Sequence, residues 1–340
     1  TCMFSQTHQA MVDVCNTVRQ ISSDIPITVG GVHITSAYMG KQTNATLKKD
    51  LKNVQFLFYN EAELAFIEFV RVVNGKKHID SLHQVAFIDT PEEINFSERL
   101  TPSSDDLNKI AAHDLMKSST LSQNGKIGGF YSLLPSLTPI STVLSNRGCR
   151  AQCTFCSVRN FNGVGVRRRS VQSVIEELKS LKYDHGIQHI MWLDDDFLYN
   201  KEESLKLFNE IVKHNLDLTW DCTNGVIAAS CTADVMEAAA ASGCIGLTVG
   251  MESGNPEILK RVKKPGTVKN FLNAASVLNK IEQINARVFL MIGFPGETYG
   301  QITDTINLSR EMGLDWYNVT ILQPLPNTAI FDQMLSEGLI

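Results

Sequence analysis

The chain contains no hydrophobic run long enough to cross a lipid bilayer. A membrane-spanning helix needs about 20 consecutive apolar residues. The longest apolar runs of this sequence, such as Val288–Ile292, are far shorter. The chain also lacks a basic N-terminal region followed by an apolar segment, the pattern that marks a protein for export. With 43% hydrophobic and 20% charged residues, the composition predicts an ordinary globular protein of the cytoplasm.

An excess of basic residues is missing as well. The formal net charge is −5, and proteins that bind nucleic acid usually carry a clearly basic surface. Arg167, Arg168 and Arg169 form the one dense basic run of the sequence, and a solvated loop or the entrance of a helix would account for it. We therefore expect a small-molecule substrate and no nucleic-acid or membrane partner.

The first residues have the composition of the end of a buried strand. The chain starts at Thr1 and continues directly into Cys2, Met3 and Phe4. From this start we expect a fragment whose N-terminal part is missing.

Residues 1–78 alternate between helix and strand patterns, and a glycine pair, Gly30 and Gly31, follows the first of the strands. This alternation predicts the C-terminal half of a doubly wound, Rossmann-like domain. Residues 79–138 have weaker periodicity and are expected to connect two domains, with a possible hairpin around Thr90-Pro91. The expected helices lie at 8–21 and 61–73, the strands at 25–29 and 54–59, and the arms of the hairpin at 83–89 and 93–99.

Residues 139–340 repeat a regular strand–helix rhythm. Strands are expected at 141–146, 188–193, 218–222, 245–250, 286–292 and 316–322, and helices at 171–182, 202–214, 232–242, 268–282, 299–312 and 328–336. Parallel strands with helical crossovers form an open sheet or curl toward a barrel. The predicted fold class is therefore α/β, a partial (β/α)6 TIM-like barrel preceded by half of a doubly wound domain.

Three of the eight cysteines are crowded into one segment. Cys149, Cys153 and Cys156 follow the first barrel strand with the spacing CxxxCxxC, and barrels of this kind build their active sites in the loops after the strands. Without an export signal, a metal site is expected here rather than a disulfide framework. The remaining five cysteines stand in apolar or small-residue surroundings and are expected to pack as small hydrophobic side chains: Cys2, Cys15, Cys222, Cys231 and Cys244.

The cysteine segment lacks a fourth ligand. A closed zinc or iron–sulfur site normally takes four protein ligands, and the nearest further candidate in the sequence is His185. Three ligands leave one metal position open, where a small molecule can bind and react. A zinc site that borrows a distant fourth ligand is the alternative.

Motifs at successive strand ends resemble the radical S-adenosylmethionine (SAM) superfamily. In the cysteine segment, the aromatic Phe155 stands immediately before the last cysteine. Further motifs end later strands: MWLDDDF at 191–197, GMESG at 250–254, MIGFPGET at 291–298 and QPLPNT at 323–328. The resemblance covers the barrel region and implies a 4Fe–4S cluster held by Cys149, Cys153 and Cys156, with SAM on the fourth iron and Phe155 beside the cluster.

The resemblance also implies contacts to SAM. Glu252 would accept hydrogen bonds from the ribose hydroxyls, Lys264 would face the methionyl carboxylate, and Ile292 and Gly293 would line the adenine. For Lys264 the alternative is a solvated helix end shared with Arg261 and Lys263.

Two aspartates of the second strand-end motif are further candidates. Asp195 is expected near SAM or the substrate, and its neighbour Asp194 could act there too. Both could equally be structural carboxylates that order the mouth of the barrel.

The N-terminal half-domain resembles the cobalamin-binding domain that precedes many radical SAM enzymes. The resemblance rests on TVGGVHIT at 28–35 and FYNEAE at 58–63. It implies that Gly30 and Gly31 allow the backbone to approach the nucleotide tail of cobalamin, since glycine has no Cβ. The DxHxxG motif that supplies a cobalt-ligating histidine in many such domains is absent. Either it lies upstream of a truncated start, or the protein holds cobalamin without a lower histidine, or it has lost the motif, and His33 is not expected to replace it.

Together these resemblances imply a cobalamin-associated radical SAM enzyme. It would cleave SAM reductively to a 5′-deoxyadenosyl radical, with an electron donor such as flavodoxin or ferredoxin, and methylate or rearrange an unactivated carbon. A methylthiotransferase-like RNA modifier and a non-catalytic iron–sulfur sensor are the alternatives. The sequence does not identify the substrate.

Overall fold

The computed structural model describes residues 7–39, 49–87, 99–115, 117, 133–135 and 138–340. The chain forms two compact units. The first comprises residues 1–103, 155–163 and 324–340, and the second comprises 104–154 and 164–323. The modules expected from the sequence, 1–78, 79–138 and 139–340, are continuous in the chain, whereas these units are not.

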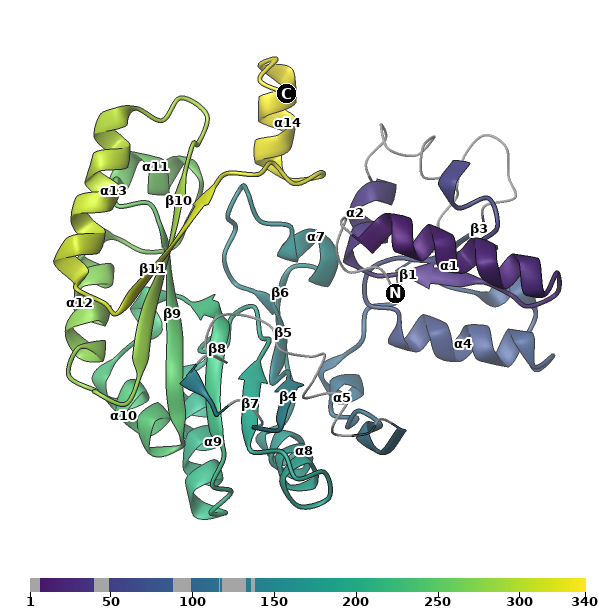
Figure 1. Cartoon of the computed structure of the whole chain (residues 1–340), viewed down its shortest axis with the longest axis horizontal. Coiled ribbons are helices and arrows are strands. Elements are labelled where there is room, and N and C mark those ends of the chain that lie inside the picture. The colour runs from purple at the N-terminus through teal and green to yellow at the C-terminus, as the bar shows by residue number, and fades with distance from the viewer. Residues whose placement is uncertain (1–6, 40–48, 88–98, 116, 118–132, 136–137) are drawn as a thin grey trace. The chain divides into compact units, whose positions relative to one another are not determined.

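The second unit is built around a six-stranded sheet in which every neighbouring pair of strands is parallel. The strand order is β11-β10-β9-β8-β7-β4, and helices follow the strands along its outer side (Figure 1). This sheet confirms the predicted fold class. The strands are β4 (Ile140–Val143), β7 (His189–Trp192), β8 (Thr219–Val226), β9 (Cys244–Glu252), β10 (Asn285–Ile292) and β11 (Trp316–Ile321).

The helices of this unit lie close to their predicted positions because their apolar faces recur with helical spacing. Polar side chains cap several of their N-termini: Ser170 caps α8, and Thr298 caps α13 with a capping box. The main helices are α8 (Val171–Tyr183), α9 (Lys201–Lys213), α10 (Ala233–Ala241), α11 (Pro256–Arg261), α12 (Val268–Leu278) and α13 (Tyr299–Met312). Shorter elements are α5 (Ser104–Leu107), η3 (His113–Leu115) and η5 (Ala228–Ser230).

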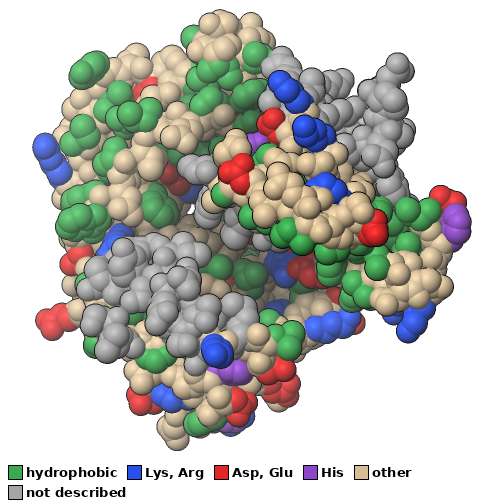
Figure 2. Space-filling view, turned by 45° about the vertical axis from the view of Figure 1, so that its right-hand side comes forward, with side chains coloured by type: hydrophobic (Ala, Val, Ile, Leu, Met, Phe, Trp, Pro, Cys, Tyr) green, Lys and Arg blue, Asp and Glu red, His purple; other side chains and the backbone are tan. Residues whose placement is uncertain are grey.

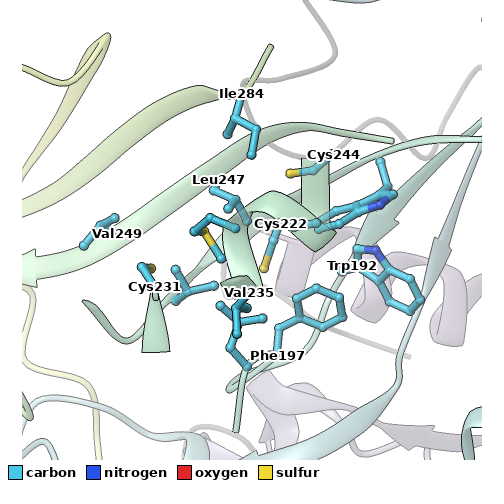
Figure 3. Packing of buried hydrophobic residues seen from close by; sticks show 14 of the residues in the cluster. Trp192, Phe197, Cys222, Cys231, Val235, Cys244, Leu247, Val249 and Ile284 are labelled. Carbon is cyan, nitrogen blue, oxygen red and sulfur yellow. The ribbon is translucent and has the colours of Figure 1, made fainter. Parts of the chain in front are cut away.

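The core between sheet and helices is apolar and partly aromatic. Trp192 stacks on Phe197 with ring centroids 4.9 Å apart, and Phe208 stacks on Trp220 at 5.3 Å. Figure 3 shows three cysteines, Cys222, Cys231 and Cys244, among these buried side chains. As predicted, these thiols pack as hydrophobic groups.

The first barrel strand is shorter than predicted. A continuous strand at 141–146 was expected, but β4 ends at Val143, and β5 (Asn146–Cys149) pairs antiparallel with β6 (Gly165–Arg168). The sequence pattern hides this break because Leu144 and Ser145 continue the strand-like composition. The cysteine segment therefore starts from a separate two-stranded ribbon, β5-β6.

The first unit contains a three-stranded sheet in the order β1-β2-β3. Leu57 and Phe58 point to opposite faces of β2, and each belongs to a different hydrophobic cluster. Helix α1 packs into the first cluster and α4 into the second, so the sheet has a helix on both faces, as a doubly wound domain requires. The elements are α1 (His8–Ile21), β1 (Thr28–Gly30), α2 (Val32–Met39), β2 (Phe56–Phe58), α4 (Glu63–Val73), η2 (Ile79–Ser81), β3 (Val85–Phe87), α7 (Val158–Asn162) and α14 (Ala329–Ser336).

Strand β3 lies in the region expected to begin a hairpin, and it pairs antiparallel with β2. The hairpin turn and most of its second arm lie outside the described residues. Helix α4 exposes Phe66, Ile67, Val70 and Val73, each more than 40% accessible.

The surface shows no dominant basic region on the face drawn in Figure 2. Lys and Arg side chains of the described residues are scattered there among acidic and apolar ones. Among the described residues, no helix combines the length and the apolar character needed to span a membrane.

Candidate functional site

Three consecutive aspartates organise the carboxyl end of the barrel sheet. Asp194, Asp195 and Asp196 follow β7, and each accepts hydrogen bonds from a different part of residues 145–150. Because this segment carries Cys149, the aspartates fix the backbone that leads into the cysteine loop.

Asp194 is completely buried and bonds to two residues of this segment. Its carboxylate accepts from the backbone N–H of Ser145 at 3.0 Å and of Asn146 at 2.7 Å, and from the Ser145 hydroxyl. Burial raises the pKa of Asp194 to about 7, while these hydrogen bonds and the charge of Arg168 oppose the rise. Of the two roles considered for Asp194, near SAM or the substrate or structural, the structural role accounts for these contacts.

Asp195 and Asp196 hold the next residues of the same segment. Asp195 Oδ2 accepts from the backbone N–H of Gly148 at 3.2 Å, where φ is 91° and a Cβ would lie 2.3 Å from a backbone oxygen of β6. Asp196 Oδ2 accepts from Arg150 Nε at 3.0 Å and lies 4.0 Å from Cys149 Sγ. A contact between Asp195 and SAM stays a prediction.

The three clustered cysteines differ from the other described cysteines in exposure. Cys149 and Cys153 are half-buried and Cys156 is exposed, and none of them forms a disulfide. By contrast, burial raises the pKa of Cys15, raises that of Cys231 to about 12, and raises those of Cys222 and Cys244 well above the ordinary value. Metal ligation requires the thiolate, so the donor set of the segment fits a cluster and these buried thiols do not.

Among the described residues, no group of three or more His, Cys, Asp or Glu side chains is arranged around a common point for one metal ion. In an iron–sulfur cluster the thiolates bind separate irons, so a cluster does not require that arrangement. Convergence of the three cysteines on one cluster stays a prediction.

Glu252 and Lys264 form an ion pair at the end of β9. Lys264 Nζ lies 3.0 Å from Glu252 Oε1, and their side chains are only 11% and 12% exposed. The backbone of Glu252 is left-handed, with φ at 65°, which turns the carboxylate at the strand end. A Cβ on Gly250 would lie 2.8 Å from Lys264 Nζ, so the glycine leaves room for the pair.

The alternative of a solvated helix end is wrong for Lys264, whose side chain is mostly buried in this pair, whereas Arg261 and Lys263 are exposed. The same region is joined to the cysteine loop. The backbone N–H of Thr154 donates to the carbonyl of Val262 at 3.0 Å. This hydrogen bond joins the residue after Cys153 to the residue two positions before Lys264.

The end of β10 forms a turn at the predicted adenine contacts. Gly293 has φ at 86°, and Glu297 Oε2 accepts from the backbone N–H groups of Gly293 at 2.7 Å and Phe294 at 3.2 Å. Glu297 therefore fixes the turn that follows Ile292. Glu297 lies within the MIGFPGET motif, but this role was not predicted from the sequence.

In the first unit, Gly30 and Gly31 end β1 at the carboxyl edge of the small sheet. A Cβ on Gly30 would lie 3.1 Å from both the Cβ and the carbonyl oxygen of Phe58, so this edge is tightly packed. Gly31 has φ at 117°, a conformation that favours glycine. The packing of Phe58 accounts for Gly30 and the backbone conformation accounts for Gly31, and the cobalamin contact itself stays a prediction.

Phe155 and Cys156 belong to the first unit, in the segment 155–163 that contains α7. Two side chains missed by the sequence analysis, Asn60 and Arg99, donate to carbonyl oxygens of this segment. Asn60 lies inside the FYNEAE motif, and its left-handed φ of 55° could not be read from the sequence.

Comparison with known proteins agrees with this geometry. Residues 143–309 match the sequence profile of the radical SAM superfamily. A methyltransferase of Pyrococcus horikoshii described as uncharacterized is 26% identical over 337 residues, which cover 98% of this chain and 69% of the relative. Cytidylyl-2-hydroxyethylphosphonate methyltransferase of Streptomyces wedmorensis is 22% identical and covers 94% of this chain and 63% of its own length.

A solved structure is similar in fold over almost the whole chain. It is the radical SAM methyltransferase TsrM from Kitasatospora setae with cobalamin and a 4Fe–4S cluster bound. The TM-score is 0.78 at 16% sequence identity, and the match covers 97% of this chain and 63% of TsrM. The chain thus spans roughly two thirds of the length of these proteins.

Proposed function

The chain belongs to the radical SAM superfamily through its domain at residues 143–309, and on this premise we propose that it is a cobalamin-associated methyltransferase. Its substrate would be a small molecule with an unactivated carbon. Cys149, Cys153 and Cys156 would hold a 4Fe–4S cluster, and the edge at Gly30 and Gly31 would approach cobalamin. The cluster, SAM and cobalamin supply the radical and methyl-transfer chemistry when bound.

The residues of the chain bind and orient these groups. Asp194, Asp195 and Asp196 hold the strand that enters the cysteine loop, so the thiolates start from a fixed backbone. Lys264 and Glu252 offer opposite charges to the two polar ends of SAM, the methionyl carboxylate and the ribose hydroxyls. Glu297 keeps the turn at Gly293 in place for the adenine.

One observation carries the proposal. The half-buried cysteine segment is anchored by the aspartates after β7 and bonded through Thr154 to the helix end before Lys264. A sensor would have no use for a nearby Glu–Lys pair suited to a nucleoside and an amino acid. The fold similarity to TsrM and the methyltransferase relatives support a transferase with cobalamin.

A cytoplasmic location and an electron donor of the flavodoxin or ferredoxin type belong to the proposal as well. The cluster must receive one electron for each SAM that is cleaved reductively. Rearrangement of a carbon skeleton is the other reaction that a radical and cobalamin would allow.

Anaerobic reconstitution with iron, sulfide and cobalamin tests the proposal. After reduction by dithionite, the protein should convert SAM to 5′-deoxyadenosine or S-adenosylhomocysteine, and cobalamin should remain bound through gel filtration. The matched control replaces all three clustered cysteines by Ala. Product formation without any bound cobalamin would favour an enzyme that uses SAM alone, and a cluster that never reacts with SAM would favour a sensor.

A further inference from the structure

Helix α7 begins two residues after Cys156 and has only five residues. The last four carbonyl groups of any α-helix lack partners within the helix, so a helix this short depends on outside donors. Here the donors come from the N-terminal sheet. Asn60 Nδ2 donates to the carbonyl oxygens of Asn160 and Phe161, both at 2.8 Å, and Arg99 donates to the latter at 2.8 Å.

Asn60 is built into the carboxyl edge of that sheet. It follows β2 by two residues and is 5% exposed. Its backbone has φ at 55°, which asparagine tolerates better than most residues. Gln84 holds this conformation, since its side-chain amide donates to the carbonyls of Tyr59 and Glu61, on either side of Asn60.

Asn60 is also joined to the glycine pair of the same edge. Its backbone N–H donates to Thr35 Oγ1 at 2.9 Å, and that hydroxyl donates to the carbonyl of Gly31 at 3.0 Å. One hydrogen-bonded path thus runs from Gly31 through Thr35 and Asn60 to α7, the helix that follows Cys156.

Two further asparagines join the same helix to the end of the first unit. Asn160 Nδ2 donates to the carbonyl of Asn327, and Asn327 Nδ2 donates to the carbonyl of Ser36 at 2.9 Å. The segment 155–163 is therefore held from both sides by the elements that surround the carboxyl edge of the small sheet.

We propose that Asn60 is a positioning residue for the cluster. Through α7, Asn60 sets the position of Cys156 and couples this cysteine to the ligand edge at Gly30 and Gly31. The inference rests on the proposed function, because it takes Cys156 as an iron ligand and that edge as the cobalamin site. A ligand that moves the edge would shift the carbonyl partners of α7, and cluster assembly would in turn order the edge.

The test uses the reconstituted full chain and the substitution Asn60→Asp. Aspartate keeps the shape of the side chain and tolerates positive φ, but it places a carboxylate oxygen against two carbonyl oxygens. Hydrogen-bond partners of a metal ligand contribute roughly ten- to a hundredfold to metal affinity, and Asn60 acts one step further out, through α7. We expect iron to be released to a chelator about tenfold faster or more, with altered g-values of the reduced cluster in electron paramagnetic resonance.

Asn74→Asp is the matched control. Asn74 also donates from its side chain to a backbone carbonyl, that of Val70 at 2.7 Å, but at the exposed end of α4. It should leave iron release and the spectrum unchanged. Because Asn60→Asp could impair folding, Arg99→Gln serves as a second variant that removes one donor to the carbonyl of Phe161, and it should accelerate iron release in the same direction.

Cobalamin provides the coupling measurement. In the parent protein, added cobalamin should slow iron release, and this protection should be lost in Asn60→Asp. Equal release rates and identical spectra for the parent and both variants would overturn the positioning role, and equal protection would overturn the coupling. If the parent protein binds neither cluster nor cobalamin, the proposed function fails before the role of Asn60 is reached, so the two failures are distinguishable.

Discussion

Lys264 and Glu252, twelve residues apart in the sequence, meet in a mostly buried ion pair at the end of β9, with 3.0 Å between Nζ and Oε1. The resemblance to the radical SAM superfamily implies that they contact opposite ends of SAM. Paired to each other, the two charges compensate one another. In the proposed function each would exchange its partner for a SAM group of suitable polarity. The cost of leaving either charge alone in this place would be considerable.

Replacing Glu252 by Ala should weaken SAM binding and leave the cluster spectrum intact. The loss of hydrogen bonds to a charged acceptor costs about 1.5–3 kcal/mol, which is roughly ten- to a hundredfold in the dissociation constant. Isothermal titration of the reconstituted protein measures it, and Glu257→Ala, at the exposed start of α11, is the control. An unchanged dissociation constant would make Glu252 a structural partner of Lys264.

Gly250→Ala tests the room around the pair. The new Cβ would lie 2.8 Å from Lys264 Nζ, the far end of a flexible side chain, so the lysine can shift and the fold should survive. We expect weaker SAM binding with little change in melting temperature. Gly243→Ala is the contrast, because its Cβ would lie 2.1 Å from the Leu218 carbonyl oxygen at a φ of 100°. That variant should lose stability markedly, and similar melting temperatures for both would contradict the argument.

Replacing Cys149, Cys153 and Cys156 together by Ala should abolish iron retention after reconstitution. Cys231→Ala is the control, since its buried thiol has a pKa raised to about 12 and stays protonated. It should keep the iron content of the parent protein while losing some stability to the cavity that it leaves. Iron that persists without the three clustered cysteines would refute the assignment.

The stability of the cluster-free protein should depend on Asp194 between about pH 4 and pH 7. Burial raises the pKa of Asp194 from 3.8 to about 7, so the folded state binds a proton that the unfolded chain releases. This contribution is complete below the unfolded value and is lost as the pH rises through the folded one, at up to about 1.4 kcal/mol per pH unit.

Asp194→Asn should remove that pH dependence, because the amide does not titrate. Melting temperatures at pH 5 and pH 7.5 measure the effect, and Asp217→Asn, beyond the end of α9, is the control. The same fall in melting temperature with and without Asp194 would assign the pH dependence to other groups.

The barrel was predictable because its elements are long and periodic. Helix α13 begins and ends at the residues expected from its pattern, and β10 differs from the expectation by one residue. The short elements were not predictable in this way. Helix α11 begins at Pro256 behind an Asn255 cap, and its few residues carry no periodic signal.

The candidate site was predictable as a set of motifs but not as a set of contacts. Strand-end motifs placed Glu252 and Gly293 correctly at the carboxyl ends of β9 and β10, because parallel strands bring those ends to one edge. Cys149 instead ends β5, in the separate antiparallel ribbon. The bonds from Ser145 and Asn146 to Asp194 and from Asn60 to α7 join residues far apart in the chain. Such pairings depend on tertiary packing, and a single sequence carries no local pattern for them.

The interleaving of the two units constrains how the chain can fold during synthesis. Domains generally fold as units in the order in which they leave the ribosome. Here residues 324–340 complete the first unit, although the whole of the second unit precedes them. The hydrogen bonds from Asn160 to the carbonyl of Asn327 and from Asn327 to the carbonyl of Ser36 can therefore form only after the last barrel strand has been made.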